Sequence, residues 1–146
     1  MTAPQIDYQT VFQEMPCPVM LITPELAIAD MNFAYLRLTD RKREDLLGRH
    51  VFDAFPDDPA ESGATGTSNL GASMHRVLAT GERDNMPLQR YDVQPTDGTG
   101  AFEERYWCPV NAPVFGPDGR VVLIAHWVEE VSGLVRQFVA AQAASA

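Results

Sequence analysis

The first apolar residues of the chain recur at the spacing of one helix face. They are Tyr8, Val11, Phe12 and Met15, and the predicted helix ends before Pro16. Two short apolar runs follow at 18–23 and 26–31, with a Pro-Glu turn between them. Runs of this length on either side of a turn predict an antiparallel pair of strands.

Short helices are predicted next. Asn32 is a suitable N-cap for a helix that turns Phe33 and Leu36 inward, with Tyr35 as a further candidate. Thr39 or Asp40 then begins a second short helix that Gly48 closes.

The region that follows has two parts with different patterns. Residues 61–69 are rich in Gly, Ser and Thr without periodicity, which predicts a loop. A second helical stripe then ends at Gly81. Its members are Leu70, Met74, Val77 and Leu78.

The last third of the chain reads as strands. Residues 86–94, 101–115 and 120–132 are strand-like, and the connections contain Asp97-Gly98 and the turn at 116–119. Two strands, several helices and three strands form an α+β order. We therefore expect five antiparallel strands with the helices packed on one face.

Composition narrows the class of protein. A chain of 146 residues, 45% hydrophobic and 21% charged, is typical of one globular domain. Its net charge of −9 disfavours nucleic acid and anionic membranes as partners. The sequence contains neither a leader pattern nor about 18 successive apolar residues, so we expect a cytoplasmic protein. Cys17 and Cys108 fit neither a disulfide framework nor a zinc site and are interpreted as structural thiols.

The sequence has few features of an enzyme. Phosphate-loop, dinucleotide, zinc-protease and nucleophile-elbow motifs are all missing from it. One cluster could be read as a metal or acid–base site: His50, Asp53, Asp57, Asp58 and Glu61. Turn and cap preferences around Pro56 and Pro59 explain these acids better, with the acids solvated. We therefore do not expect catalysis by this chain.

Several motifs occur in an order that is known from one family. N-x-A-Y at 32–35, L-T-D and E-D-L-L-G-R within 38–49, and F-P-D-D-P at 55–59 resemble the front half of a PAS domain. Residues 109–132, with a D-G turn and the ending Glu130-Val131-Ser132, resemble its last two strands. The resemblance covers about residues 8–132. It implies a PAS fold in which short helices cross the concave face of the sheet and wall a small-molecule cavity.

The resemblance, together with strand parity, predicts which side chains face this cavity. From the helices and the segment after Gly48 we expect Phe33, Leu36, Phe52, Phe55, Leu70, Met74 and Leu78. From the strands we expect Tyr91, Val93, Trp107, Asn111, Ile124, His126 and Val128.

Three of these residues have competing interpretations. His126 could contact a ligand, although a buried neutral His bonded to the backbone is the simpler interpretation. Asn111 could orient a ligand or bond a neighbouring backbone group. Trp107 could be a core residue or a stacking platform.

The family's known cofactors are not indicated. In haem-binding PAS proteins the iron ligand is a His on the helix before the third strand, and His75 is the matching candidate. It lies on the flank of its helix, so a solvated surface position is favoured. The flavin-binding branch carries a reactive Cys where this chain has residues 50–53, which contain no thiol. Neither haem nor flavin is therefore expected, and the cofactor is unknown.

The resemblance implies a division into an N-terminal flanking helix (1–17), a PAS core (18–132) and a C-terminal linker helix (133–146). We expect a bacterial signalling sensor that binds a small ligand and relays its state through the flanking helices. A homodimer and a histidine kinase or other effector region are the expected partners. Candidates for dimer contacts and relay are Val11, Phe12, Met15, Leu134 and Phe138. The alternative is a ligand-free scaffold for dimerisation and protein contacts.

Overall fold

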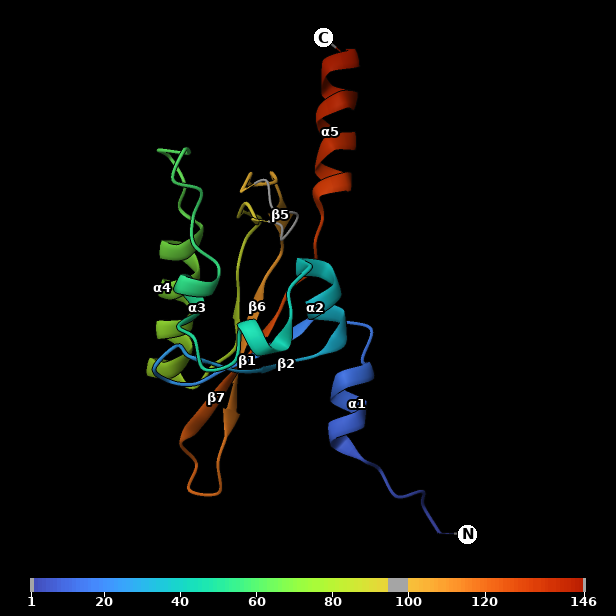
Figure 1. The fold of residues 1–146 in the computed structure, drawn as a ribbon, viewed down its shortest axis with the longest axis vertical. Coiled ribbons are helices and arrows are strands. Elements are labelled where there is room, and N and C mark those ends of the chain that lie inside the picture. The colour runs from blue at the N-terminus through green and yellow to red at the C-terminus, as the bar shows by residue number, and fades with distance from the viewer. Residues whose placement is uncertain (1, 95–99, 146) are drawn as a thin grey trace.

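The computed structural model describes residues 2–94 and 100–145, so the predicted turn at Asp97-Gly98 lies outside the described residues. Figure 1 shows helices around a twisted sheet. In chain order the elements are α1 (Tyr8–Glu14), β1 (Val19–Ile22), β2 (Ile28–Met31), α2 (Phe33–Thr39), a 3₁₀ turn (Arg43–Asp45), α3 (Val51–Ala54), α4 (Gly66–Thr80), β3 (Asp84–Asn85), β4 (Gln89–Arg90), β5 (Tyr106–Trp107), β6 (Val110–Phe115), β7 (Val121–Trp127) and α5 (Ser132–Ser145).

The central sheet has five antiparallel strands in the order β2-β1-β7-β6-β3. The turn at 116–119 joins β6 to β7, and Gly119 takes the positive φ of +80° that the turn needs. The α+β class and the five-stranded antiparallel sheet are therefore confirmed.

The predicted strand at 86–94 is wrong in its extent. The fifth strand of the sheet is β3, which has only two residues and pairs with β6. Pro87 and Pro109 have no N–H to donate, so the ladder stops near them and the chain leaves the sheet. β4 and β5 instead pair with each other as a separate ribbon.

Local chemistry explains where α2 begins and ends. The side-chain oxygen of Asn32 accepts the N–H of Tyr35, as predicted for an N-cap. Asp40 ends the helix in the left-handed region with a φ of +53°. The helix predicted to run from Thr39 or Asp40 to Gly48 is reduced to the 3₁₀ turn.

α4 begins earlier than predicted. The helix starts at Gly66, inside the stretch 61–69 that was expected to be a loop. The carboxylate of Asp57 accepts the backbone N–H of Thr67 at 3.1 Å and its hydroxyl at 2.6 Å. A cap supplied from another segment is invisible in the local pattern. The predicted end at Gly81 is confirmed, with a φ of +68°.

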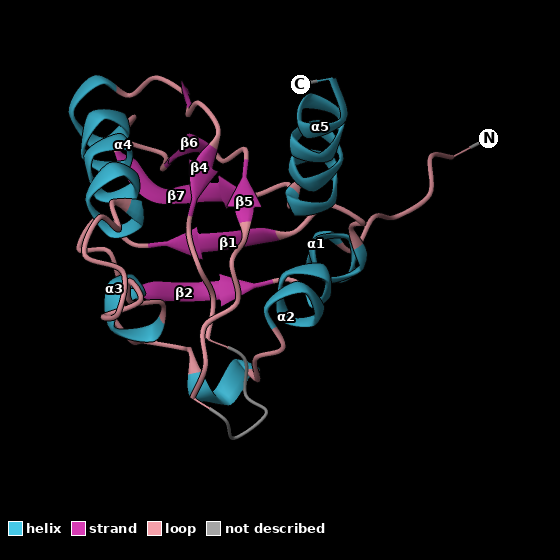
Figure 2. Cartoon of the chain, turned by 90° about the horizontal axis from the view of Figure 1, so that it is seen from above, coloured by secondary structure: helices cyan, strands magenta, loops and turns pink. Residues whose placement is uncertain are grey.

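Figure 2 shows α3 and α4 near one end of the strands and α1, α2 and α5 near the other. α5 points away from the body of the domain, and Ser132 is its one buried residue. The hydroxyl of Ser132 accepts the N–H of Tyr106 at 2.9 Å, which joins the base of α5 to β5. Within residues 2–94 and 100–145, no helix has the length and apolar character that crossing a membrane requires.

Candidate functional site

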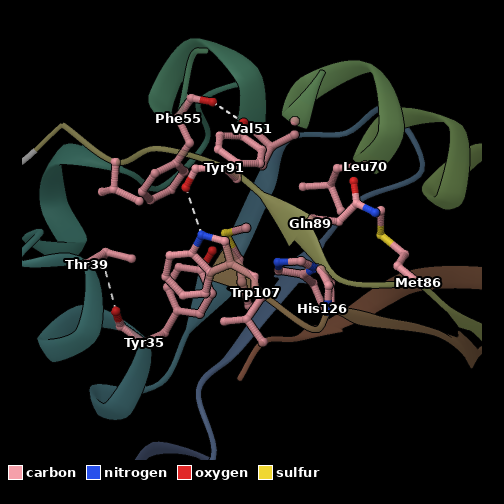
Figure 3. Close-up of a pocket in the computed structure, with 15 residues that line it drawn as sticks. Tyr35, Thr39, Val51, Phe55, Leu70, Met86, Gln89, Tyr91, Trp107 and His126 are labelled. Atoms are coloured by element: carbon pink, nitrogen blue, oxygen red, sulfur yellow. Dashed lines mark hydrogen bonds between the residues drawn. The ribbon is translucent and has the colours of Figure 1, made fainter. Parts of the chain in front are cut away.

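A cavity of about 50 Å³ lies between the sheet, α2, α3, α4 and the β4–β5 ribbon. Figure 3 shows aromatic rings gathered around this space. The lining residues are Met20, Tyr35, Thr39, Val51, Phe55, Gly66, Leu70, Met86, Gln89, Tyr91, Val93, Trp107, Pro109, His126 and Val128. The volume holds more than one water and lies far below the roughly 300–1,000 Å³ of typical ligand pockets. Only a small ligand fits without movement of the walls.

Hydrogen bonds to backbone carbonyls fix one wall of the cavity. The indole N–H of Trp107 donates to the carbonyl oxygen of Tyr91 at 2.8 Å. The hydroxyl of Tyr91 donates in turn to the carbonyl oxygen of Phe55. Both bonds are drawn in Figure 3. β5, the segment after β4 and the segment after α3 are thus held together by two aromatic side chains.

The side chains that line the cavity are uncharged at physiological pH. Burial lowers the pKa of His126 to about 4, so its imidazole is uncharged. Burial also raises the pKa of Tyr35 and of Tyr91, so both phenols keep their protons. Among the described residues, no Asp, Glu, Lys or Arg lines the cavity.

His126 and Asn111 are cross-strand neighbours on β7 and β6, and their side chains bond to each other. The Nδ1 of His126 lies 2.7 Å from the Oδ1 of Asn111. The histidine is therefore buried and neutral, and the partner is a side chain instead of the expected backbone group. Asn111 likewise bonds side chains, since its Nδ2 donates to the Oγ of Ser73 at 2.8 Å.

The structure places half of the predicted cavity residues at the cavity. Those in its wall are Phe55, Leu70, Tyr91, Val93, Trp107, His126 and Val128. Asn111, Met74 and Ile124 are fully buried in the core behind that wall. Trp107 is a buried core residue, 5% exposed, that also lines the cavity.

Neither Phe33 nor Leu36, the two α2 residues predicted to face the cavity, lines it. Phe33 is 39% exposed and its ring lies under the guanidinium of Arg43, outside the cavity. Leu36 packs against the core only in part. The inward residues are Tyr35 and Thr39, and at about 100° per residue Tyr35 lies roughly 200° from Phe33.

Phe52 and Leu78 are partly buried against the core and do not line the cavity. Phe52 packs on α4 beside Gly71. The remaining cavity-lining residues are Met20, Tyr35, Thr39, Val51, Gly66, Met86, Gln89 and Pro109. Two of them carry a signal in the sequence. Met20 lies on the buried parity of β1, and Gly66 has no Cβ.

The cofactor and metal candidates lie away from the cavity. His75 is exposed on α4, and a haem or flavin ring system exceeds the cavity's volume. In the acidic segment, Asp57 caps α4 and Asp58 accepts the N–H of Ala60 at 2.9 Å. Within the part of the chain that the structure describes, no three His, Cys, Asp or Glu side chains are grouped to hold a metal ion. Cys17 and Cys108 are free and half-buried.

Solved structures with the same fold include an isolated PAS domain, a sensor histidine kinase and a protein in complex with a ligand and DNA. A PAS domain from Colwellia psychrerythraea is 11% identical, with a TM-score of 0.65 over 86% of this chain and 95% of that one. A sensory box sensor histidine kinase from Vibrio cholerae is 14% identical, with a TM-score of 0.57 over 86% and 88%. A VqmA–ligand–DNA complex from Vibrio cholera is 15% identical, with a TM-score of 0.61 over 87% of this chain and 52% of that one.

Comparison with curated proteins finds no match. At these identities the solved structures establish the fold alone. The sequence itself matches the family model described as the PAS fold over residues 12–136, which is most of the chain. The expected resemblance is thereby confirmed, and the chain belongs to the PAS-fold family, whose domains are sensor modules of signalling proteins.

Proposed function

We propose that this PAS domain is a cytoplasmic sensor module of bacterial signal transduction that binds a small ligand in its cavity. The observation that carries the proposal is the cavity itself, which has aromatic walls and a neutral lining. Such a pocket, apolar with a few polar groups, suits a small uncharged molecule. Two free thiols agree with a reducing compartment.

A route from the cavity to the end of the domain supports a signalling role. Trp107 lines the cavity and lies on β5. The backbone of β5 accepts the N–H of Val131 at Tyr106, and the N–H of Cys108 donates to the carbonyl of Glu129. A ligand that displaces Trp107 therefore acts on the segment from which α5 begins. α5 and α1 would pass that change to a second copy of the chain and to an effector such as a histidine kinase region.

The proposal is tested by what the protein binds. The purified chain would be denatured and the released small molecules identified by mass spectrometry. A library of small molecules would then be screened for a rise in melting temperature, which any ligand specific for the folded state must produce. At least one compound should raise the melting temperature of the wild type and not that of Leu70→Trp, whose larger side chain fills the cavity.

Ligand sensing would be contradicted if no compound of a chemically broad library raised the melting temperature and the denatured protein also released no small molecule. The Leu70→Trp variant must keep a cooperative unfolding transition, so that loss of binding is not loss of fold. The matched control is Leu47→Trp at an exposed position outside the cavity, which should retain every thermal shift.

The second candidate is a ligand-free scaffold for dimerisation and protein contacts. Exposed apolar side chains on the flanking helices favour it, together with the small size of the cavity. On α1 they are Tyr8 and Val11, and on α5 they are Leu134, Phe138 and Val139. The half-buried Phe12 and Met15 lie beside the first group.

Light scattering of truncated chains tests the scaffold role. Deletion of residues 1–15 or 133–146 should abolish dimerisation and leave the core folded. A truncated chain that still dimerises would count against these helices as the interface.

A further inference from the structure

A continuous chain of polar side chains runs from the surface to the cavity. The register places Asp84, Asn111 and His126 opposite one another on β3, β6 and β7. At the surface, Arg76 donates to the carboxylate of Asp84 at 2.9 Å. The hydroxyl of Ser73, on α4, also bonds that carboxylate and links it to Asn111. Asn111 then bonds His126.

Within this series of polar side chains, the direction of every hydrogen bond is fixed. Hydrogen bonds from Arg76 and Ser73 lower the pKa of Asp84, so its carboxylate only accepts. Ser73 must donate its single hydroxyl proton to Asp84, and its oxygen therefore accepts from the Nδ2 of Asn111. A flipped amide would set the Oδ1 of Asn111 against a hydroxyl with no proton left to give.

The fixed amide determines which nitrogen of His126 carries the proton. The Oδ1 of Asn111 can only accept, so the Nδ1 of His126 must be the protonated nitrogen. Because the buried ring is neutral, Nε2 holds a lone pair. The polar chain thus presents a hydrogen-bond acceptor at the end of His126.

Two polar groups of the cavity wall have no partner among the described residues: the Nε2 of His126 and the hydroxyl of Tyr35. The one completely buried side-chain nitrogen or oxygen without a partner there is the Nε of Arg41. Both cavity groups therefore keep some accessible surface, although their residues are only 2% and 6% exposed. Since both residues line the cavity, that surface belongs to it.

The remaining polar side chains of the wall are satisfied by the protein. Thr39 donates to the carbonyl of Tyr35 at 2.9 Å, and the indole of Trp107 is bonded to Tyr91. Gln89 bonds Asn69 through its oxygen and the carbonyl of Pro87 through its nitrogen. A bound molecule therefore meets one free acceptor and one free donor, on rings whose centroids are 6.1 Å apart.

We propose that the cavity selects a small uncharged molecule that donates a hydrogen bond to the Nε2 of His126 and accepts one from the hydroxyl of Tyr35. The inference rests on the proposed function and specifies its ligand class. Among the described residues the wall offers an anion no cation to face, only the Nε2 lone pair, and it offers an ammonium group no carboxylate. A molecule with an N–H beside a carbonyl, such as a lactam, satisfies both groups.

The first test needs no ligand. The ¹⁵N chemical shifts of the His126 ring at pH 7 should report a protonated Nδ1 and an unprotonated Nε2. Ser73→Ala removes the oxygen that accepts from the Nδ2 of Asn111 and so fixes the amide, and the two tautomers should then become mixed. A protonated Nε2 in the wild type would overturn the inference and leave ligand binding by the cavity untouched.

The second test uses matched probes: 2-pyridone, N-methyl-2-pyridone, benzene and benzoate, with affinities from thermal shifts and titration. Each is larger than the cavity of about 50 Å³, so each binds only if the walls move apart. 2-Pyridone should bind most tightly. N-methylation should weaken binding at least about tenfold, because it leaves the buried Nε2 unpaired. Tyr35→Phe should weaken 2-pyridone binding about threefold to tenfold. The control is Tyr106→Phe, which removes a hydroxyl bonded to Glu104 outside the cavity.

The outcomes separate the two proposals. If benzoate or N-methyl-2-pyridone binds as well as 2-pyridone, the ligand class is wrong and the sensor function stands. The same holds if the broad library yields only ligands without a donor–acceptor pair. If neither the probes nor the library bind, both proposals fail.

Discussion

The side-chain oxygen of Asn32 lies 3.0 Å from the backbone nitrogen of Val19 and accepts its hydrogen bond. The same side chain caps α2 and donates to the carbonyl of Cys17 at 2.8 Å. One fully buried amide thus joins the start of β1 to the start of α2. This makes Asn32 the residue that fixes where the inward face of α2 lies relative to the sheet.

Asn32→Ala should therefore destabilise the domain by about 3 kcal/mol, because buried donors and acceptors lose their partners. Urea denaturation measures the loss. Asn69→Ala, at an exposed position on α4, is the control and should cost less than about 1 kcal/mol. Equal effects of the two substitutions would contradict the role given to Asn32.

Stability should fall in mild acid because of His126. Its pKa is about 4 in the fold against 6.5 for the free side chain, so the unfolded state binds more protons between these values. The free energy of unfolding therefore falls as pH drops from about 6.5, by about 3 kcal/mol at pH 4. Around the ring lie Asn111, Met20 and Tyr35, and of these only the phenol ionises, with a raised pKa.

Chemical denaturation at several pH values checks this dependence. His126→Gln should remove the part of the slope that belongs to the imidazole, and His75→Gln, at an exposed site, should retain it. An unchanged slope in His126→Gln would show that other groups account for the acid sensitivity.

Gly66→Ala should disturb the cavity wall. A Cβ at Gly66 would lie 2.6 Å from the Cδ2 of Tyr91, so the tyrosine ring must move. We expect a loss of about 1–3 kcal/mol and weaker ligand binding. Gly63→Ala is the matched control, because nothing lies within 4 Å of its Cβ position. Equal unfolding midpoints for the two variants would argue against close packing at Gly66.

Arg43 should hold α1 against the domain. Its guanidinium bonds the carboxylate of Asp30, the carbonyl of Met31 at 2.7 Å and the side chain of Gln13 on α1 at 2.6 Å. Arg43→Met should therefore speed hydrogen exchange in α1 and cost about 1–2 kcal/mol, since the ion pair is partly exposed. Lys42→Met is the exposed control. Unchanged exchange in α1 would mean that other contacts hold this helix.

The parts of the fold that could be predicted are those with local chemical signals. The Asn32 cap, the end of α4 at Gly81 and the turn before Gly119 each depend on residues within one turn of the chain. β3 could not be predicted, because two polar residues carry no alternation and its place is set by pairing with β6. The early start of α4 depends on Asp57, which is distant in sequence.

The cavity-lining residues were predictable where strand parity applies and unpredictable on α2. Alternation along the strands places Trp107, His126 and Val128 on the buried side. α2 has seven residues, fewer than two full turns, so its apolar positions do not define one face. Its inward residue, Tyr35, is amphipathic and competes in sequence with the more apolar Phe33. The choice is made by docking against the sheet.

The attachment of α5 at Ser132 gives the end of the chain the properties of a lever. Its 14 residues extend for about 20 Å at the α-helical rise. A tilt of about 10° at the base would carry the far end through about 3.5 Å over that length. Because Ser132 at the base of α5 is bonded to β5, a small movement of β5 would be enlarged to several ångströms at the far end of the helix.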